Sequence, residues 1–325
     1  IQVLSKELIK EKLNKFGLEK EPFLFVISYD FSKFYIEKIS QIPSNIKFQL
    51  DEKENLEKSF KKTKLEKFPI TFKEYEKKFD ILQEEIKKGN SYLLNLTAKT
   101  KIQTSISLDE IYENTKSKFK LRFQNERDDF VCFSPERFVQ IMDNKICTYP
   151  MKGTIDASIL NAKEKILADK KEMAEHTMVV DLLRNDLGII GSNVRVENFR
   201  YVETINAGDK KLLQVSSKIS ANLEDKWSDK IGDILSSILP AGSITGTPKK
   251  KTVEILKNIE NYDREFYTGV FGVVDGKNLD SAVMIRFIQK ELNAELYYKS
   301  GGGITCDSKA KLEYEELIDK IYLPF

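Results

Sequence analysis

The chain has 325 residues with 53 basic and 51 acidic side chains, so its formal net charge is only +2. This balance argues against nucleic acid or an acidic membrane surface as a partner. The cysteines, at positions 132, 147 and 306, are too widely spaced for a disulfide framework or a CxxC zinc site. No apolar run approaches the roughly 20 residues that span a bilayer, and no signal peptide is visible. These features predict a cytoplasmic protein without a membrane partner.

The first fifty residues show a helical pattern and then a strand pattern. They predict one helix and two strands, over 4–16, 23–29 and 34–39. The run 51–67 is almost wholly charged, which is typical of a solvated connection. We therefore predict a short N-terminal subdomain with its charged connection over 1–70 and a larger domain over 71–325, which together form one large globular unit.

The second part begins with a capping box formed by Thr71 and Glu74, which predicts a helix that Gly89 ends. Further strands are predicted over 92–100, 130–133, 137–141, 145–149, 212–219, 267–274, 281–289 and 295–300. Further helices are predicted over 161–187, 231–239, 250–259 and from 308 onwards. Many strands with interspersed helices indicate a mixed layering of helices and sheets.

Two pairs of glutamates at i, i+3 spacing fall on predicted helices, Glu172 with Glu175 and Glu313 with Glu316. Both pairs border an apolar stripe, where carboxylates need a cationic partner or a metal ion. Oxygen ligands of this kind suit Mg²⁺. The alternative, that each pair is an ordinary solvated helix face, stays open at this point.

Histidine is scarce, since His176 is the only one in the chain. Zinc is therefore disfavoured and Mg²⁺ is the better candidate. A Cys-His or Ser-His catalytic triad is excluded unless His176 serves it, and no nucleophile elbow is visible. We expect that the chain does not hydrolyse glutamine itself.

Three short segments could bind or attack a small anionic molecule. Lys152 lies in the turn-bounded segment 149–154, which suits an amine nucleophile. The glycine-containing segment 241–249 precedes a helix and could hold an anion, although its spacing does not match a P-loop. Ser300 and the three glycines after it could offer bare amides to a carboxylate, or could form a flexible turn.

The chain resembles the chorismate-utilising enzymes in an ordered set of segments: 134–138 (SPERF), 150–154 (PMKGT), 171–188, 241–249, 285–286, 300–303 and 313–316. The resemblance covers roughly 71–325, which it identifies as a chorismate-binding catalytic domain. It implies an α+β fold, an α/β/β/α sandwich like that of anthranilate synthase component I. In this sandwich two β-sheets pack orthogonally and the site lies between them.

The resemblance also implies the roles of individual residues. Glu175 and Glu316 would bind Mg²⁺ directly, and Glu172 and Glu313 would support it through water. Glu136 would be a general acid and then a general base. The substrate would be bound by Thr154, Gln214, Thr245, Tyr267, Arg286, Gly301, Gly302, Gly303 and Lys320.

Within the family, Lys152 indicates the branch, because anthranilate synthases carry alanine at that place. The resemblance is closest to the branch that aminates chorismate to 4-amino-4-deoxychorismate in para-aminobenzoate and folate biosynthesis. It implies that neutral Lys152, with a pKa lowered by a partly dry site, is a covalent nucleophile. Ammonia would come from a separate glutamine amidotransferase subunit.

Two positions depart from the family pattern. Gln214 stands where members usually have a histidine, and Leu93 stands where isochorismate-forming members have a lysine and aminating members a glutamine. The short N-terminal part lacks the segment that forms a tryptophan pocket, so no tryptophan feedback site is expected. The alternatives are anthranilate synthase component I, an isochorismate-forming enzyme and a catalytically impaired chorismate-binding protein.

Overall fold

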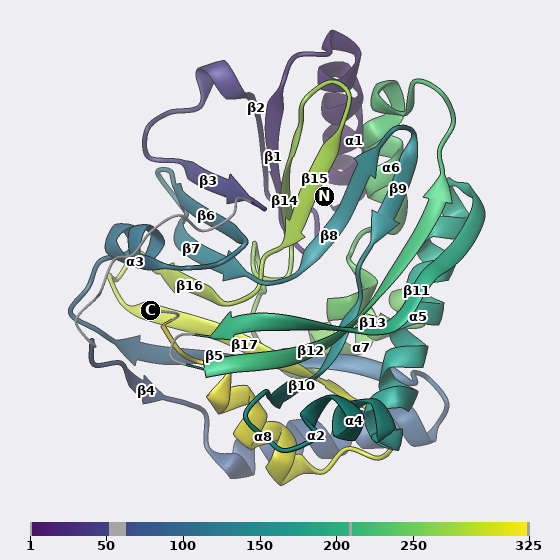
Figure 1. Ribbon diagram of the computed structural model, residues 1–325. Helices are drawn as coiled ribbons and strands as arrows, with labels where there is room; N and C mark the ends of the chain where they lie inside the picture. The colour runs from purple at the N-terminus through teal and green to yellow at the C-terminus, as the bar shows by residue number, and fades with distance from the viewer. Residues whose placement is uncertain (1, 52–62, 208–209, 324–325) are drawn as a thin grey trace.

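The structure is a computed structural model that describes residues 2–51, 63–207 and 210–323. Most of the charged run 51–67, predicted to be a solvated connection, lies outside the described residues. The described strands form two antiparallel sheets that lie between layers of helices (Figure 1). In this view β14 and β15 run steeply, whereas β5 and β17 lie nearly level. The predicted α/β/β/α sandwich is confirmed.

The first sheet contains strands from both halves of the chain. Its order is β10 (Met151–Asp156), β12 (Lys210–Asn222), β9 (Lys145–Thr148), β8 (Arg137–Met142), β15 (Leu279–Val283), β14 (Val270–Val274), β1 (Phe23–Ile27) and β2 (Phe34–Lys38), and β11 (Ser192–Ala207) also pairs with β12.

The second sheet is similarly mixed. Its order is β13 (Gly246–Thr247), β5 (Leu93–Gln103), β17 (Leu296–Ile304), β16 (Phe287–Lys290), β7 (Asp129–Ser134), β6 (Phe119–Gln124) and β3 (Lys47–Leu50), and β4 (Glu66–Phe68) pairs with β5. The first 70 residues thus supply strands to both sheets. The domain boundary at residue 70 stays a prediction.

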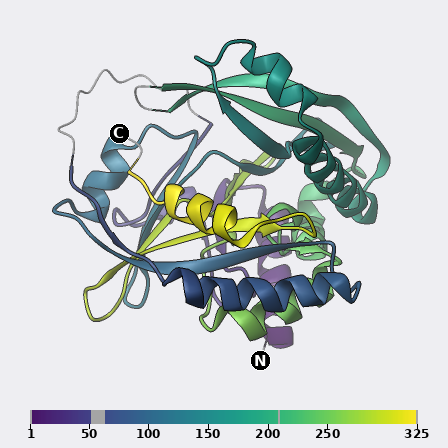
Figure 2. The same cartoon turned by 90° about the horizontal axis from the view of Figure 1, so that it is seen from below.

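Helices cover the outer faces of the two sheets. The first sheet carries α1 (Gln2–Glu19), α5 (Lys170–Ile190) and α6 (Ile231–Ile238). The second carries α2 (Phe72–Lys87), α7 (Lys249–Glu260) and α8 (Ala310–Asp319), and α2 lies beside α8 in Figure 2. Shorter helices are α3 (Leu108–Asn114), α4 (Ala162–Ala168), η1 (Ile39–Gln41), η2 (Trp227–Lys230) and η3 (Gly242–Ile244).

Strand β1 shows how the layers are held together. Because side chains alternate along a strand, Phe23 and Phe25 pack on the helix side, whereas Leu24 and Val26 pack in the core between the two sheets. All four are fully buried. Burial of each such side chain is worth on the order of 1.5–3 kcal/mol, so this strand contributes to both cores.

Three predicted elements differ from the structure in more than a few end residues. The helix over 161–187 is two helices, because Asp169 ends the first and accepts the N–H of Glu172 as the N-cap of α5, which continues past Gly188. The strand over 281–289 is divided between β15 of the first sheet and β16 of the second. The glycines 301–303, which could have formed a turn, continue β17 and pair with β5.

Two chain crossovers between the sheets lie side by side. Glu136 lies where the chain passes from β7 to β8, and Arg286 lies where it passes from β15 to β16. The N–H of Val283 donates to the carbonyl of Glu136 at 3.2 Å, and that of Phe133 donates to the carbonyl of Arg286 at 3.2 Å. Arg286 has a positive φ of 52°, which turns the chain at this point. The crossovers therefore bring an acid and a guanidinium to the boundary between the sheets.

Candidate active site

Lys152 lies in an irregular part of β10, where the pairing with β12 shifts between Met151 and Thr154. The next residue, Gly153, has a φ of +90°, and a Cβ there would lie 3.2 Å from Oε2 of Glu172. Glycine therefore permits both the turn and the close approach of α5. The Nζ of Lys152 donates to Oε2 of Glu175 at 2.7 Å.

The two predicted glutamate pairs come together from α5 and α8. The Nζ of Lys171 lies 3.7 Å from Oε1 of Glu175 and 3.8 Å from Oε1 of Glu313, so one ammonium stands between the helices. On α8, Oε1 of Glu316 lies 2.7 Å from Nζ of Lys320. Carboxylates of both helices and several lysines therefore share one region.

The glycines of β17 border this region. A Cβ on Gly302 would lie within 3.7–3.9 Å of side-chain atoms of Glu313, Glu316 and Lys320. A Cβ on Gly303 would lie 3.5 Å from Nζ of Lys152. The carbonyl of Gly301 accepts from Lys320 at 2.8 Å. Because glycine has no side chain, there is room beside both Lys152 and Lys320.

Charge in this region is incompletely balanced. Burial raises the pKa of Glu172 and of Glu313, and the neighbouring carboxylates Glu175 and Glu316 raise them further. For Lys152, burial lowers the pKa, but the facing carboxylates, of which Glu175 contributes most, together outweigh burial and the pKa is raised. The expectation of a lowered lysine pKa is wrong for the protein without ligands, because it left out the facing glutamates.

Glu136 accepts a hydrogen bond from a residue that the sequence had not indicated as part of a site. The Oγ of Ser243 donates to Oε1 of Glu136 at 2.5 Å. Burial raises the pKa of Glu136, although Ser243, Arg286 and Lys152 each oppose the rise. A carboxyl group with a raised pKa suits a general acid. Ser243 lies in the segment 241–249, whose glycines had attracted attention as an anion loop.

The remaining predicted residues lie around the same boundary. Arg286 donates from Nε to the hydroxyl of Tyr322 at 3.3 Å, and its charge partly opposes the rise that burial causes in the pKa of both Glu136 and Tyr267. Tyr267 is buried, and burial raises its pKa. Thr245 is also buried and bonds through Oγ1 to the carbonyl of Ala241 at 2.8 Å.

Gln214 lies opposite Thr154 across the β10–β12 pair. The hydroxyl of Thr154 donates to Oε1 of Gln214 at 2.9 Å, and Nε2 of Gln214 donates to the carbonyl of Gly153 at 3.2 Å. Gln214 is thus fixed beside the irregular segment that carries Lys152.

A family profile described as "chorismate binding enzyme" matches residues 8–324. The chain belongs to the chorismate-binding enzymes. It is 45% identical over 317 residues to an uncharacterized PabA-like protein of Haemophilus influenzae, covering 97% of this chain and 95% of that protein. It is 31% identical over 261 residues to aminodeoxychorismate synthase component 1 of Klebsiella aerogenes, covering 76% of this chain and 56% of the relative.

Solved structures agree on the fold of this chorismate-binding enzyme. Anthranilate synthase component I of Streptococcus pneumoniae matches with a TM-score of 0.69 at 26% identity, over 79% of this chain and 58% of that one. The menaquinone-specific isochorismate synthase MenF of Escherichia coli matches with a TM-score of 0.71 over 95% of this chain and 79% of that one. At 15% identity, the second match shows the fold alone. The predicted anthranilate synthase-like fold is confirmed.

Chorismate-binding enzymes typically use Mg²⁺, and the donors here are of the kind that this ion takes. In the described residues, no three acidic, histidine or cysteine side chains are gathered closely enough to hold a metal ion. The glutamates are instead separated by Lys152, Lys171 and Lys320. The donor set consists of oxygens only, and the Lys171 ammonium already places a positive charge between α5 and α8, where Mg²⁺ would have to draw the carboxylates closer.

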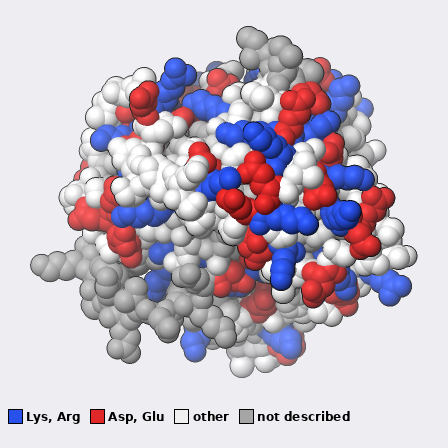
Figure 3. Space-filling view, turned by 90° about the horizontal axis from the view of Figure 1, so that it is seen from above, with Lys and Arg blue, Asp and Glu red and all other residues white. Residues whose placement is uncertain are grey.

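Two further observations concern membrane-spanning segments and surface charge, which the composition had addressed. In the ranges that the structure describes, no helix is long and apolar enough to cross a membrane. On the face shown in Figure 3, basic and acidic side chains are interspersed, so this face carries no large patch of one sign.

Proposed function

We propose that this chorismate-binding enzyme aminates chorismate with ammonia to 4-amino-4-deoxychorismate, with Lys152 as a covalent nucleophile. The observation that carries the proposal is the position of the Lys152 amine, which is directed to Glu175 and lies next to Gly303 at the sheet boundary. The similarity to aminodeoxychorismate synthase component 1 over three quarters of the chain supports it.

Two displacements give the product. The Lys152 amine bonds to C2 of chorismate, the double bonds shift, and the C4 hydroxyl leaves. Glu136 gives this hydroxyl a proton, so that water departs. Ammonia then bonds to C4, the double bonds shift back, and the C2–N bond to Lys152 breaks. Glu136 takes up the proton that the adding ammonia loses, and the free amine of Lys152 is restored.

Several residues would prepare this chemistry. Arg286, Tyr267 and the backbone of Gly301–Gly303 would hold the substrate carboxylates, and Lys320 would add positive charge nearby. β16 pairs with β17 only up to Lys299, so β16 leaves one edge of the glycine segment uncovered. Thr154, Gln214 and Thr245 would shape the pocket around the ring.

The amine must lose its proton before it attacks. In the ligand-free protein the carboxylate of Glu175 stabilises the charged form of Lys152. Glu175 and Glu316, with Glu172 and Glu313 in support, would hold Mg²⁺, whose positive charge would compete with the Lys152 ammonium and help to orient the acidic substrate. Burial, which lowers the pKa of Lys152, would then dominate.

Ammonia is proposed to reach this site from a separate glutamine amidotransferase subunit. The single histidine, His176, has an exposed fraction of 0%, so it cannot act on a glutamine molecule that binds at the surface. Free ammonium replaces the subunit in the first test.

The test is mass-spectrometric product analysis after the chain is incubated with chorismate, MgCl₂ and ammonium chloride at mildly alkaline pH. The wild type should form aminodeoxychorismate, and Lys152→Ala should not. Lys299→Met is the control, since it removes a buried lysine outside the site.

Other products would change the assignment. Anthranilate would indicate anthranilate synthase component I despite Lys152, and isochorismate would indicate an isochorismate-forming enzyme. Chorismate recovered unchanged, together with Mg²⁺-dependent binding of chorismate, would indicate an impaired binding protein. Aminodeoxychorismate formed equally well by Lys152→Ala would refute the nucleophile.

A further inference from the structure

His176 is completely buried on α5, directly after Glu175. Its Nε2 lies 2.7 Å from Oγ of Ser217 on β12, which is also completely buried. Consecutive residues on a helix point about 100° apart. The helix can therefore direct Glu175 towards Lys152 while His176 is bonded to the sheet.

Ser217 is a junction between several elements. Its N–H donates to the carbonyl of Pro150 at 3.0 Å, two residues before Lys152. Its Oγ also accepts the N–H of Arg200 from β11 at 2.9 Å. One serine thus connects the helix of Glu175, the strand of Lys152 and the neighbouring β11.

Arg200 extends this junction to the start of α5. It lies where the β11–β12 pairing shifts, has a φ of 52°, and is buried. Its guanidinium donates to the carbonyls of Ile166 and Leu167 at 3.0 and 2.8 Å. These carbonyls end α4 immediately before Asp169, the N-cap of α5. Helix α5 is thus fixed near its beginning and at its second turn.

The His176–Ser217 pair does not have the arrangement of a hydrolase. Both side chains are closed to solvent, and in the described residues no carboxylate bonds to the His176 ring, so the third group of such a triad is missing. The bond instead crosses between the two elements whose side chains meet in the site.

We propose that His176 is a positioning residue that, through Ser217, holds α5 in register with β10 so that Glu175 reaches Lys152. The proposal rests on the proposed function, which gives the contact between Glu175 and Lys152 its role. The measurements of Mg²⁺ affinity and Lys152 acetylation do not depend on which product forms. Supporting groups behind metal ligands typically change metal affinity by about 10–100-fold when they are removed.

Ser217→Ala in the full chain removes the hydroxyl with little change in volume. Titration calorimetry with MgCl₂ should show a dissociation constant raised about tenfold. Acetylation of Lys152 with acetic anhydride, followed by mass spectrometry against surface lysines of the same sample, should become faster because Glu175 no longer retains the amine. Ser217→Thr keeps the hydroxyl and should restore both values.

Ser220→Ala is the matched control. Ser220 is a buried serine on the same strand, but its hydroxyl bonds to Glu197 and not to α5. A purely structural effect would lower the melting temperature in both alanine variants and leave Mg²⁺ affinity and Lys152 acetylation unchanged. That result would overturn the proposal.

If Ser217→Ala does not fold, His176→Leu removes the same bond, and Ser217→Thr is its reference. His176→Leu should loosen Mg²⁺ and expose Lys152 to acetylation, and wild-type values in this variant would reject the proposal. Failure of the proposed function would appear differently, as a wild type that binds Mg²⁺ but forms no aminodeoxychorismate. If Mg²⁺ does not bind to the wild type at all, the acetylation ratio alone decides.

Discussion

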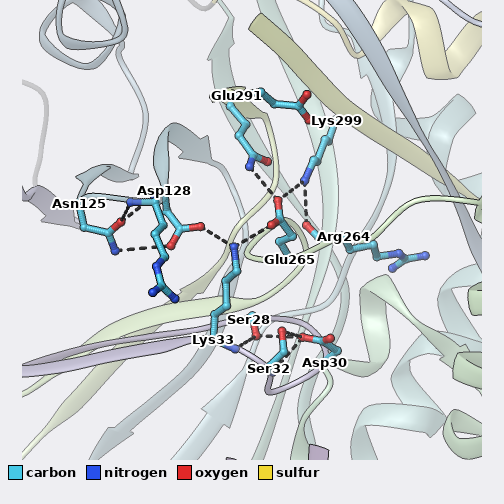
Figure 4. Close-up of polar contacts among 12 residues, drawn as sticks. Ser28, Asp30, Ser32, Lys33, Asn125, Asp128, Arg264, Glu265, Glu291 and Lys299 are labelled. Carbon is cyan, nitrogen blue, oxygen red and sulfur yellow. Dashed lines mark hydrogen bonds and ion pairs between the residues drawn. The ribbon is translucent and has the colours of Figure 1, made fainter. Parts of the chain in front are cut away.

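Two clusters of charged side chains in this chain differ in how completely they are paired. In the Glu265 network, formed by Lys33, Asp128, Glu265, Gln289 and Lys299, Nζ of Lys33 lies 2.7 Å from both Asp128 and Glu265 (Figure 4). The second oxygen of Glu265 accepts from Gln289 at 2.7 Å. In the candidate active site, Lys152 and Lys320 each have a carboxylate at 2.7 Å, but Lys171 stands 3.7 and 3.8 Å from the two carboxylates that it faces.

The pKa values express the same difference. Burial alone would raise the pKa of Glu265, but the hydrogen bonds from Lys33 and Gln289 hold it at about 2. The pKa of Glu172 and of Glu313 is raised from its ordinary value. A network whose carboxylates are satisfied internally stabilises the fold, whereas the unsatisfied cluster is prepared to accept an ion or a substrate.

The largest expected effect comes from Lys152→Met, which removes the amine from the unsatisfied cluster. We expect the rate of aminodeoxychorismate formation to fall by about 10³-fold or more, because both displacements use this nitrogen. Product formation measured by mass spectrometry tests this. Lys299→Met, in the satisfied network, should keep the rate within severalfold of wild type, and an equal loss in both variants would contradict the comparison.

Glu175→Gln should weaken Mg²⁺ binding by about 100-fold, because it removes the carboxylate charge that faces both Lys152 and Lys171. Calorimetric titration with MgCl₂ measures this change. In the same assay Glu265→Gln should bind Mg²⁺ as the wild type does. Equal weakening by the two substitutions would show that the clusters do not differ as described.

Glu265→Gln should instead reduce the free energy of unfolding. A glutamate with a pKa of about 2 when folded and 4.5 as the ordinary value contributes about 3 kcal/mol above pH 4.5, which is lost as the pH falls towards 2. Urea unfolding at several pH values should therefore show a difference from wild type that is largest near neutrality and shrinks in acid. The exposed Glu126→Gln is the control, and a pH-independent difference would count against this explanation.

Ser243→Ala should give the smallest effect. The Ser243 hydroxyl lowers the pKa of Glu136, so its loss should raise that pKa further. We expect the limb of the pH–rate profile that belongs to Glu136 to move to higher pH and kcat to fall by roughly three- to tenfold. Ser243→Thr keeps the hydroxyl and should retain the wild-type profile, whereas identical profiles for all three proteins would exclude a role in setting this pKa.

Features decided by nearby residues could be predicted from the sequence. The capping box of Thr71 and Glu74 forms both of its reciprocal bonds, and Gly89 adopts the positive φ expected after a helix. The glutamate pairs also lie on helices as their spacing indicated. In each case the relevant partner is within one or two turns of the same element.

Features decided by distant partners were missed. Apolar residues lie on both sides of Arg286 in 281–289, and only pairing with two different sheets reveals the turn at Arg286. The long β11 was not predicted, and the glycines 301–303 extend a strand because β5 pairs with them. The direction of the shift in the pKa of Lys152 could be predicted only from the glutamates that face it. The contact of Ser243 could be predicted only from the position of Glu136. Non-local contacts override local pattern at these places.

The side-by-side crossovers also constrain when the site can exist during synthesis. Glu136 and Val283, which bond to each other, are separated by more than 140 positions in the chain, and the carboxylates of α8 follow later still. Closing such long loops is slow, and it must precede the local geometry of the pocket. A nascent chain that has emerged from the ribosome only as far as β15 therefore cannot possess the complete pocket, so the ability to bind the substrate is acquired late in folding.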